Sequence, residues 1–375
     1  MRHVSLTTGE DIRQFCEDLV EITPDERFVR RAPMFVLDFS EDGLRHNLLS
    51  QQEQHAPRCS LYTVRNASVR GVECVVTAQG RVLTRFEQDE ARRLELFSLG
   101  IMDQFGSPNS GIVWRDGTTG LEERDEVTLS GEFALISPEE AYNYGMWLVE
   151  LVPYVHHLRS RNYGGKYLAF AETEWQRAFL EFLGIAPLTQ RQHAGQAYRI
   201  DGTLAAFRHH YRNLVLSSKD REAFEALRLS QQIADNPIQH DKLFISRKRR
   251  SDLNPSYRRL VNEDALLAAV AELGFTIIEP EYLSFSDQIS LFSKAKVIVG
   301  LGGAGMFNCV FCAPGTKIVT IESSTNWIEA HANLFASCGL DYGVIFGTGL
   351  KEDSANPHRP WQIDVARARA ALASL

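Results

Sequence analysis

Five short apolar runs alternate with four segments of helical periodicity between residues 242 and 346, and this alternation constrains the fold more than any other feature. The runs have the length of buried strands and are residues 243–245, 275–278, 297–299, 317–321 and 342–346. Asn262 and Ser284 stand where the first two helices should begin, each followed by acidic residues that suit a helix N-terminus. This alternation predicts an α/β fold with a doubly wound parallel sheet.

The third run leads into a glycine turn, Gly300-Leu301-Gly302-Gly303-Ala304-Gly305, and then into a short helix expected to end near Phe311. Glycines let the backbone approach a ligand, and the N–H groups at a helix start favour an anion. Glu322 follows the next strand, near the spacing at which an acid binds a ribose hydroxyl. The turn therefore predicts phosphate at Gly303–Gly305 and ribose at Glu322. A tight packing turn with a surface glutamate is the alternative.

A dinucleotide-dependent dehydrogenase is a second alternative, because glycines 300, 302 and 305 match the pattern G-x-G-x-x-G. Three observations count against it. The fingerprint normally opens a domain at its first strand, whereas two strand–helix units precede it here. Pro314-Gly315 cuts the following helix short, and no group of residues suited to hydride transfer is evident elsewhere.

A basic segment, Arg247-Lys248-Arg249-Arg250, begins where the first strand of this domain ends. Ligands of open α/β sheets bind at the carboxyl ends of the strands. Arg247 is therefore expected to reach a pyrophosphate with its guanidinium fork. The three cations that follow it are interpreted as a solvated loop.

The N-terminal part is less regular, and we expect it to form a separate domain over residues 1–235 with a β-rich segment at about 61–86. Strands are expected at 35–37, 61–64, 72–76, 81–83, 167–170 and 213–216, with a hairpin joining 72–76 to 81–83. Ser137 should cap a helix that kinks or ends near Pro153, and a second helix should cover 175–183. Asp235-Asn236-Pro237 marks the boundary to a second domain, 236–350, which a tail helix within 351–375 follows.

Glu150 lies in an apolar stretch near the end of the helix expected after Ser137. A partly buried carboxylate has a raised pKa and can serve as a general base. The alternative is an ordinary glutamate on the surface of an amphipathic helix. His156 and His157 follow closely and are interpreted as structural residues.

Composition excludes several classes of protein. The 40 Lys and Arg are outnumbered by 48 Asp and Glu, giving a net charge of −8, which disfavours nucleic acid as a partner. No apolar run approaches the length of a membrane span, and the N-terminus lacks the apolar core of a secretory signal. The expected location is the cytoplasm, and peripheral attachment to the inner face of a membrane remains compatible with the sequence.

Cysteine and acidic patterns give little sign of a metal. The six cysteines are scattered, and the pair Cys309 and Cys312 is expected to be two core residues on one helical turn; a redox or zinc site is the alternative. The chain contains no Asp-X-Asp, a pair of carboxylates that commonly holds a divalent ion. No metal and no cofactor is therefore expected.

Taken together, the motifs resemble glycosyltransferase family 61, which includes bacterial capsular and exopolysaccharide enzymes, plant xylan-decorating transferases and animal O-linked N-acetylglucosamine transferases. The similarity covers about residues 140 to 346. It rests on motifs in this order: Ile245-Ser246-Arg247, Arg258-Arg259-Leu260-Val261-Asn262-Glu263, Gly274-Phe275, Pro280-Glu281, Leu283-Ser284-Phe285, Gln288-Ile289, Gly302-Gly303-Ala304-Gly305, Asn308 and Pro314-Gly315-Thr316.

The resemblance implies a GT-B fold, in which two Rossmann-like domains face each other across a cleft. It also implies an inverting, usually metal-independent transfer of a sugar from a nucleotide-sugar, often a UDP-sugar, to a glycan or glycolipid acceptor. The donor-binding residues it implies are Arg247, Tyr282, Leu283, Gly302, Gly303, Ala304, Gly305, Asn308 and Glu322. By the same resemblance, residues 1–235 form the acceptor-side domain and residues 236–350 the donor-binding domain. The acceptor-side residues are Asn143, Met146 and Trp147, with Glu150 as the base.

The sequence departs from the family pattern at two positions. Met146 stands where the family usually has a histidine before the tryptophan of its acceptor-side motif, and Gly303 stands where it usually has a histidine in the glycine turn. Two functions therefore stay open: an active transferase in surface-polysaccharide biosynthesis, and a catalytically impaired subunit that binds a nucleotide-sugar or a glycan.

Overall fold

A computed structural model describes most of the chain. The described residues are 2–3, 5–6, 12–38, 50–72, 74–83, 111–115, 118–138, 140–193, 195–209, 214–232, 240–253, 258–323, 328–350 and 360–375. They form two compact units, one of residues 1–26 and 57–212 and the other of residues 27–56 and 213–375. None of the helices in these ranges is long and apolar enough to cross a membrane.

The second unit is built on a six-stranded parallel sheet in the order β18-β17-β19-β20-β21-β5. Its strands are β17 (Lys242–Ile245), β18 (Thr276–Ile278), β19 (Val297–Leu301), β20 (Lys317–Glu322), β21 (Asp341–Phe346) and β5 (Val36–Leu37). The five strands expected from the sequence are all present, and every pairing among them is parallel. The predicted α/β class is therefore confirmed for this unit.

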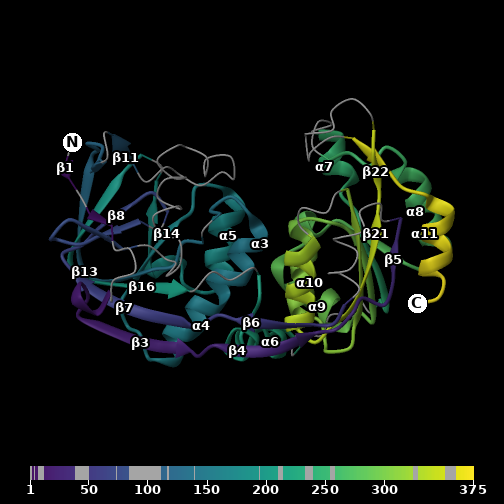
Figure 1. Ribbon diagram of the computed structural model, residues 1–375, viewed down its shortest axis with the longest axis horizontal. Coiled ribbons are helices and arrows are strands. Elements are labelled where there is room, and N and C mark those ends of the chain that lie inside the picture. Colours follow the sequence, from purple (N-terminus) through teal and green to yellow (C-terminus); the bar gives the residue numbers. More distant parts are fainter. Residues whose placement is uncertain are drawn as a thin grey trace. The chain divides into compact units, whose positions relative to one another are not determined.

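Helices cover both faces of this sheet (Figure 1). One face carries α8 (Glu263–Glu272) and α11 (Val365–Leu372), and the other carries α9 (Phe285–Lys294) and α10 (Ile328–Ser337). The remaining elements are α6 (Ser218–Gln232), α7 (Lys248–Leu253), β22 (Thr348–Gly349), β23 (Trp361–Gln362) and the short 3-10 helices η5 (Pro280–Tyr282) and η6 (Ala304–Phe311).

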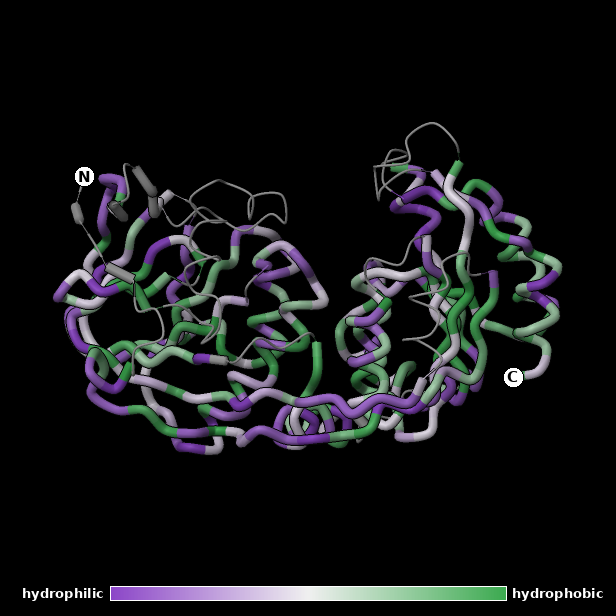
Figure 2. The backbone as a smooth tube through the Cα atoms, in the orientation of Figure 1, coloured by the Kyte–Doolittle hydropathy of each residue, from purple (hydrophilic) through white to green (hydrophobic). Residues whose placement is uncertain are grey.

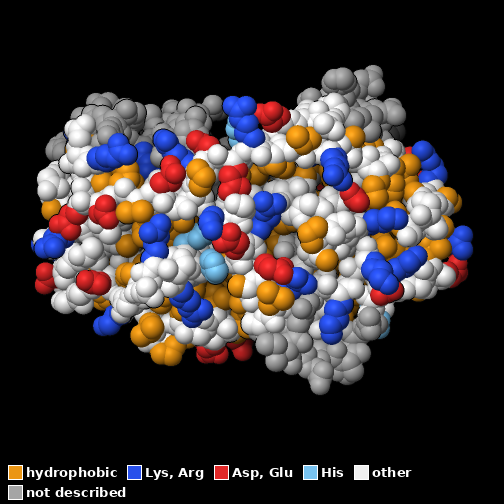
Figure 3. Space-filling view, turned by 90° about the horizontal axis from the view of Figure 1, so that it is seen from below, with side chains coloured by type: hydrophobic (Ala, Val, Ile, Leu, Met, Phe, Trp, Pro, Cys, Tyr) orange, Lys and Arg blue, Asp and Glu red, His pale blue; other side chains and the backbone are white. Residues whose placement is uncertain are grey.

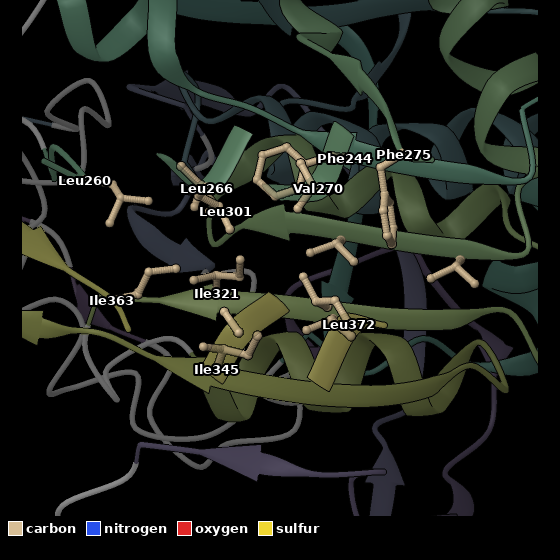
Figure 4. Close-up of a cluster of buried hydrophobic side chains, with 14 of the residues drawn as sticks. Phe244, Leu260, Leu266, Val270, Phe275, Leu301, Ile321, Ile345, Ile363 and Leu372 are labelled. Atoms are coloured by element: carbon tan, nitrogen blue, oxygen red, sulfur yellow. The ribbon is translucent and has the colours of Figure 1, made fainter. Parts of the chain in front are cut away.

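Because both faces are covered, the central strand β19 is apolar and buried along its whole length, as parallel strands generally are (Figure 2). The core between the sheet and the pair α8–α11 is drawn in Figure 4, where Phe244 from β17 lies beside Val270 from α8, and Leu372 from α11 belongs to the same cluster. The expected tail helix is thus part of this unit's core. Asp364 caps it by accepting a hydrogen bond from Arg367 N.

Part of the N-terminal sequence belongs to this unit, which differs from the predicted boundary near residue 235. The strand at Val36–Leu37 was expected, but it pairs in parallel with Val344–Ile345 of β21. Two longer strands, β4 (Glu26–Arg30) and β6 (Gln52–Ala56), precede and follow β5 in the sequence and pair with each other in a separate two-stranded sheet. The buried Arg30 guanidinium donates from Nη1 to Asn333 Oδ1 of α10, at 2.9 Å. A boundary drawn from composition could not reveal this excursion, because the edge strand is only two residues long.

The first unit contains a ten-stranded mixed sheet. Its parallel part is β15 (Thr189–Gln192), β14 (Lys166–Phe170), β13 (Glu126–Leu135) and β16 (Ala197–His209). The strands β7 (Cys59–Arg65) and β8 (Ser68–Arg70) pair antiparallel with β16, and β3 (Asp18–Thr23), β9 (Cys74–Val76), β10 (Arg81–Leu83) and β2 (Ser5–Leu6) extend the sheet. A separate small sheet holds β1 (Arg2–His3), β11 (Ile112–Arg115) and β12 (Thr118–Leu121).

Several expectations for this unit are confirmed. The β9–β10 hairpin forms, and β7 and β14 occur at the predicted places. The helix expected at 175–183 is α5 (Glu174–Phe182), which begins with a capping box made by Thr173 and Gln176. The remaining helical segments are α3 (Tyr144–Met146), the π-helix η3 (Trp147–Leu151), α4 (Val152–Ser160), and the 3-10 turns η1 (Ile12–Gln14) and η4 (Ala186–Leu188).

Two predictions of local structure are wrong, and one strand was not predicted at all. Ser137 does not cap a helix, because its hydroxyl instead accepts a hydrogen bond from Phe170 N and the first helical residue is Tyr144. The segment predicted as a strand at 213–216 forms a turn in its described part, with Leu214 at φ 53°, and it leads into α6. The long strand β16 went unrecognised, since its glycine and polar residues hide the strand pattern. The expected break at 235–237 lies outside the described residues.

Candidate functional site

The carboxyl ends of β17 and β19 define the candidate donor site. β17 has β18 on one side and β19 on the other, so the connections that leave β17 and β19 run to opposite faces of the sheet. A parallel sheet of this kind binds ligands at such a switch point, beyond the carboxyl ends of the strands. Arg247 follows β17 by two residues, and Gly302 follows β19 directly.

Arg247 lies against the glycine turn, as the sequence predicted. Its Nη1 donates a hydrogen bond to Gly302 O at 2.8 Å. A methyl group on Gly303 would come within 2.8 Å of the same nitrogen, so Arg247 fills the space that a side chain at 303 would need. The guanidinium carries five N–H donors in a rigid plane. The residue is half-buried, which places a fixed positive charge beside the backbone of the turn.

The turn itself requires glycine. Gly303 has φ 151°, a conformation that residues with a side chain rarely adopt, and it stands at the N-terminus of η6. At Gly302 an added methyl group would approach Glu322 Oε2 to 2.1 Å, and at Gly300 one would approach Met306 Sδ to 2.5 Å. Close packing therefore limits two of these glycines, and backbone conformation limits the third. The predicted short helix is present as a 3-10 helix of eight residues.

Glu322 lies beneath the turn rather than at the surface, with 2% of its surface exposed. Its Oε1 accepts a hydrogen bond from Thr320 Oγ1 at 2.6 Å and lies 2.8 Å from His331 Nδ1 on α10. His331 is itself buried and stacks against Phe335. In the described structure the carboxylate thus supports the turn from below, and direct ribose binding stays a prediction.

Two further residues expected to bind the donor have different settings. Asn308 is fully buried and donates from Nδ2 to Gln288 Oε1 at 2.9 Å, while Gln288 Nε2 donates to Leu283 O at 3.2 Å. Asn308 therefore acts through Gln288 on the segment that contains Leu283. Tyr282 is 51% exposed, and the guanidinium of Arg249 lies 4.2 Å from its ring centroid.

The basic segment after Arg247 is a helix and not the solvated loop that we expected. Lys248 pairs with Asp264 at 2.9 Å, and Arg249 Nε lies 3.4 Å from Glu279 Oε2. The two pairs neutralise most of this local positive charge. Acidic and basic side chains are likewise interspersed on the face shown in Figure 3. A basic surface suited to nucleic acid is not what these residues form.

The acceptor-side motif begins at Asn143 in the first unit. The helix that carries it also starts there, and not after Ser137 as the sequence suggested. Asn143 is the N-cap, and its Oδ1 accepts a hydrogen bond from Gly145 N at 2.9 Å. Met146 is 8% exposed, and Trp147 is fully buried, with Nε1 donating to Ala141 O at 2.6 Å. Trp147 also packs edge-on against Trp175, so it organises the core of this motif.

Residues 147–151 form one turn of π-helix just ahead of Pro153, and Glu150 lies in it. Proline has no backbone N–H for the regular helical ladder, and an inserted π turn can accommodate that loss. The helix then continues to Ser160 rather than ending at the proline. Such single π turns occur frequently at functional sites. Glu150 is 1% exposed, so it is not the surface glutamate that was the alternative.

Glu140 is a candidate that the sequence reasoning missed. Its Oε2 accepts a hydrogen bond from Asn143 Nδ2 at 2.6 Å. Burial raises the pKa of the Glu140 carboxyl, the bond from Asn143 lowers it, and the nearby charge of Glu150 raises it again. Two carboxylates therefore interact across this helix start. The spacing of three residues between Glu140 and Asn143 is the sequence signal that could have identified Glu140, because it suits a contact at a helix start.

The structure gives no sign of a metal centre in the residues it describes. No group of three or more His, Cys, Asp or Glu side chains there is arranged to hold an ion. Cys309 and Cys312 are buried free thiols, and burial raises the pKa of Cys309. The pair therefore consists of buried core residues at the end of η6, with Cys309 in its last turn and Cys312 as its C-cap. His157 is buried beside Phe207, in agreement with a structural role.

The chain is similar to one known protein family over part of its length. None of the curated proteins matched the sequence. Residues 144–319 match the family model described as Glycosyltransferase 61. The matched segment begins at the first residue of α3 and ends within β20, so it includes Trp147, Glu150, Arg247 and the glycine turn. This match supports glycosyltransferase family 61 as the family of the chain and thereby indicates a glycosyltransferase.

Proposed function

We propose that the chain is an inverting, metal-independent glycosyltransferase that uses a UDP-sugar as its donor. The observation that carries the proposal is the contact between Arg247 and the glycine turn at the switch point of the second unit. A guanidinium and a turn of backbone N–H groups there suit the pyrophosphate of a nucleotide-sugar. The same arrangement would stabilise the nucleoside diphosphate as it leaves.

The proposed reaction needs no metal, because Arg247 and the amide groups at the start of η6 would offset the charge of the leaving group. The sequence contains no Asp-X-Asp, the pair that commonly holds a divalent ion in other glycosyltransferases. The exposed ring of Tyr282 would lie near the nucleoside base, and the Asn308–Gln288 link would fix the neighbouring segment. Glu322 would shape the turn on which the phosphates rest and lie close to the ribose.

The acceptor would bind at the first unit, in a GT-B arrangement of the two units. A base must remove the proton of the acceptor hydroxyl, whose oxygen then attacks the anomeric carbon from the face opposite the nucleotide and inverts it. We assign this task to the interacting carboxylates Glu150 and Glu140. The proposed acceptor is a glycan or glycolipid of a bacterial surface polysaccharide, made in the cytoplasm at the inner face of the membrane.

A nucleotide panel tests the donor class. We expect UDP to raise the melting temperature of the protein more than GDP, CMP or NAD, because a ligand that binds only the folded state stabilises it. A UDP-sugar should stabilise it at least as well as UDP does. Stabilisation by NAD alone would overturn the proposal in favour of an oxidoreductase.

Substitution of Arg247 by alanine should weaken UDP binding about thirtyfold. Hydrogen bonds to charged groups contribute about 2 kcal/mol, and this corresponds to a factor of about 30 in Kd. Isothermal titration calorimetry gives the Kd directly. Arg250→Ala is the matched control, because it removes an equal charge from the exposed part of α7. An unchanged Kd in Arg247→Ala would show that the pyrophosphate binds elsewhere.

A second function, a binding subunit without catalysis, is favoured by the burial of the acceptor-side motif. Trp147 is completely buried, Glu150 is 1% exposed, and Met146 replaces the usual family histidine. Slow hydrolysis of the donor in the absence of acceptor separates the two functions. An active transferase should release UDP from at least one UDP-sugar that it binds. Tight binding with no release from any bound sugar would favour the subunit.

A further inference from the structure

Glu263 is a buried carboxylate that the proposed reaction does not yet use. It is the first residue of α8, and 4% of its surface is exposed. Asn262 precedes it and is tied to the C-terminal segment, because its Nδ2 donates to Ile363 O at 2.8 Å. Acidic residues are common in the first turn of a helix, but there they normally face solvent. A carboxylate buried in that position needs partners that repay its loss of water.

The hydrogen bonds that the Glu263 carboxylate accepts come from the segment that carries Arg247. Glu263 Oε1 accepts a hydrogen bond from Ser246 Oγ at 2.7 Å and a longer one from Arg247 N at 3.3 Å. Ser246 Oγ in turn accepts from Lys248 N at 3.1 Å. Three consecutive residues after β17 are thereby tied, directly or through one hydroxyl, to one carboxylate.

This network fixes the direction in which Arg247 leaves the strand. Its backbone is held at Glu263, and its guanidinium is held 2.8 Å from Gly302 O. A long side chain that is fixed at both ends loses little rotamer freedom when a ligand binds, and that saving appears as affinity. Ser246 is buried as well, so its hydrogen bond to Glu263 is shielded from water.

The charges around Glu263 fit this role. Burial raises the pKa of its carboxyl, and the bonds from Ser246 and Arg247 N, together with the charges of Lys248 and Arg247, lower it. Lys248 is also paired with the exposed Asp264. The carboxylate therefore interacts with both cations at the start of the segment that follows β17, and its negative charge attracts that segment toward α8.

We propose that Glu263 is a positioning residue that orients Arg247 toward the glycine turn and so sets the affinity for the diphosphate of the donor. The proposal rests on the proposed function. Glu263 would not touch the ligand, and its effect would pass entirely through Arg247. A carboxylate with a purely structural role would change stability but would not act through the guanidinium.

A double-mutant cycle with UDP as the probe tests this dependence. We expect Glu263→Gln to weaken UDP binding about tenfold in the otherwise unchanged protein and by less than twofold in an Arg247→Ala background. Glutamine keeps the acceptor oxygen but lacks the charge. Asp264→Asn, on the neighbouring exposed carboxylate, should leave the Kd within twofold. Calorimetry measures each Kd, and thermal unfolding of every variant shows whether it is folded.

The melting temperature of Glu263→Gln distinguishes positioning from a purely structural role, because a structural role predicts a loss of stability. A carboxyl whose pKa is raised in the folded state stabilises the fold at pH values below its unfolded pKa, and this contribution is lost as the pH rises through the folded pKa. At pH 7 the neutral glutamine should therefore leave the melting temperature equal to or above that of the unchanged protein. Weakened UDP binding together with unchanged stability supports positioning.

The outcomes separate the two proposals. Equal weakening by Glu263→Gln in both backgrounds, or a melting temperature that falls in step with affinity, would overturn the positioning role while leaving UDP as a ligand. Loss of folding in the single variant is addressed by Ser246→Ala, which removes one link of the same network and should weaken UDP binding about threefold. Failure of the unchanged protein to bind UDP or another nucleoside diphosphate would reject the proposed function, and the positioning role with it.

Discussion

Replacing Gly302 with alanine should destabilise the second unit by about 3 kcal/mol, which is at the upper end of the cost of overpacking a core. The added methyl group would lie 2.1 Å from Glu322 Oε2 and 2.4 Å from the carboxyl carbon. A flexible surface side chain would simply move away. Glu322 is instead held by Thr320 and His331 and is 2% exposed, so the clash has no inexpensive relief.

Thermal unfolding measures this effect, with an expected fall in Tm of about 8 °C for a unit of this size. Gly305→Ala is the matched control in the same turn. Its methyl group would lie 3.5 Å from Ile245 Cγ2, an ordinary contact, so its stability should stay within about 0.5 kcal/mol. Glu322→Ala should also reduce the cost of Gly302→Ala, because it removes the atoms that clash. A full cost of Gly302→Ala in that background would show that the carboxylate does not limit the turn.

The same contacts explain why the glycine turn could be found from the sequence but its support could not. Three glycines after a buried strand, together with an arginine after a neighbouring strand, indicated an anion site because parallel strands deliver both to one edge. Glu322 is bonded to Thr320 of its own strand and to His331 of α10, and nothing in the local pattern identifies His331 as a partner. The spacing between the glycine turn and Glu322 favoured a ribose contact, whereas the burial of Glu322 shows that it lies beneath the turn.

Local signals also failed where tertiary contacts decide the structure. Ser137 has the sequence context of an N-cap, yet its hydroxyl bonds to Phe170 N and to Gln192 in the sheet of the first unit, and the helix begins six residues later at Asn143. The strand β16 pairs with β13 over ten residues and with β7 on its other side. Long-range pairing of this kind stabilises a strand whose own sequence contains Gly202 and charged residues.

Residues 27–56 belong to the second unit for the same reason, because a long-range strand pairing decides their place. Val36 and Leu37 are apolar enough to suggest a strand, and the strand exists, but its partner is β21, more than 300 residues later in the sequence. Arg30 makes a second contact of this long-range kind when it donates a hydrogen bond to Asn333. Element type could be predicted here from residues alone, whereas the assignment of the element to a domain depended on a pairing that sequence order does not reveal.

Changes at the two carboxylates of the acceptor side should have the largest effect on catalysis. If the pair Glu140 and Glu150 accepts the proton of the acceptor, replacing either with glutamine should lower kcat about a hundredfold, the lower end of what general base catalysis contributes. The expected KM for the nucleotide-sugar is unchanged, because the donor would bind to the other unit. Glu172→Gln is a suitable control, since this partly exposed carboxylate lies outside the pair.

The pH dependence distinguishes a base from a residue that only holds the helix start. A base acts when deprotonated, so activity should fall as the pH drops through the pKa of Glu140, which burial and the charge of Glu150 raise above the usual value. Glu150→Gln removes the neighbouring charge and should move the acidic limb of the pH–rate profile to lower pH. Asn143→Ser keeps a capping hydroxyl but loses the bond that lowers the pKa, so it should move the limb to higher pH. Shifts in the same direction for both variants would mean that Glu140 is not the titrating group, and the base would then have to be sought elsewhere on the first unit.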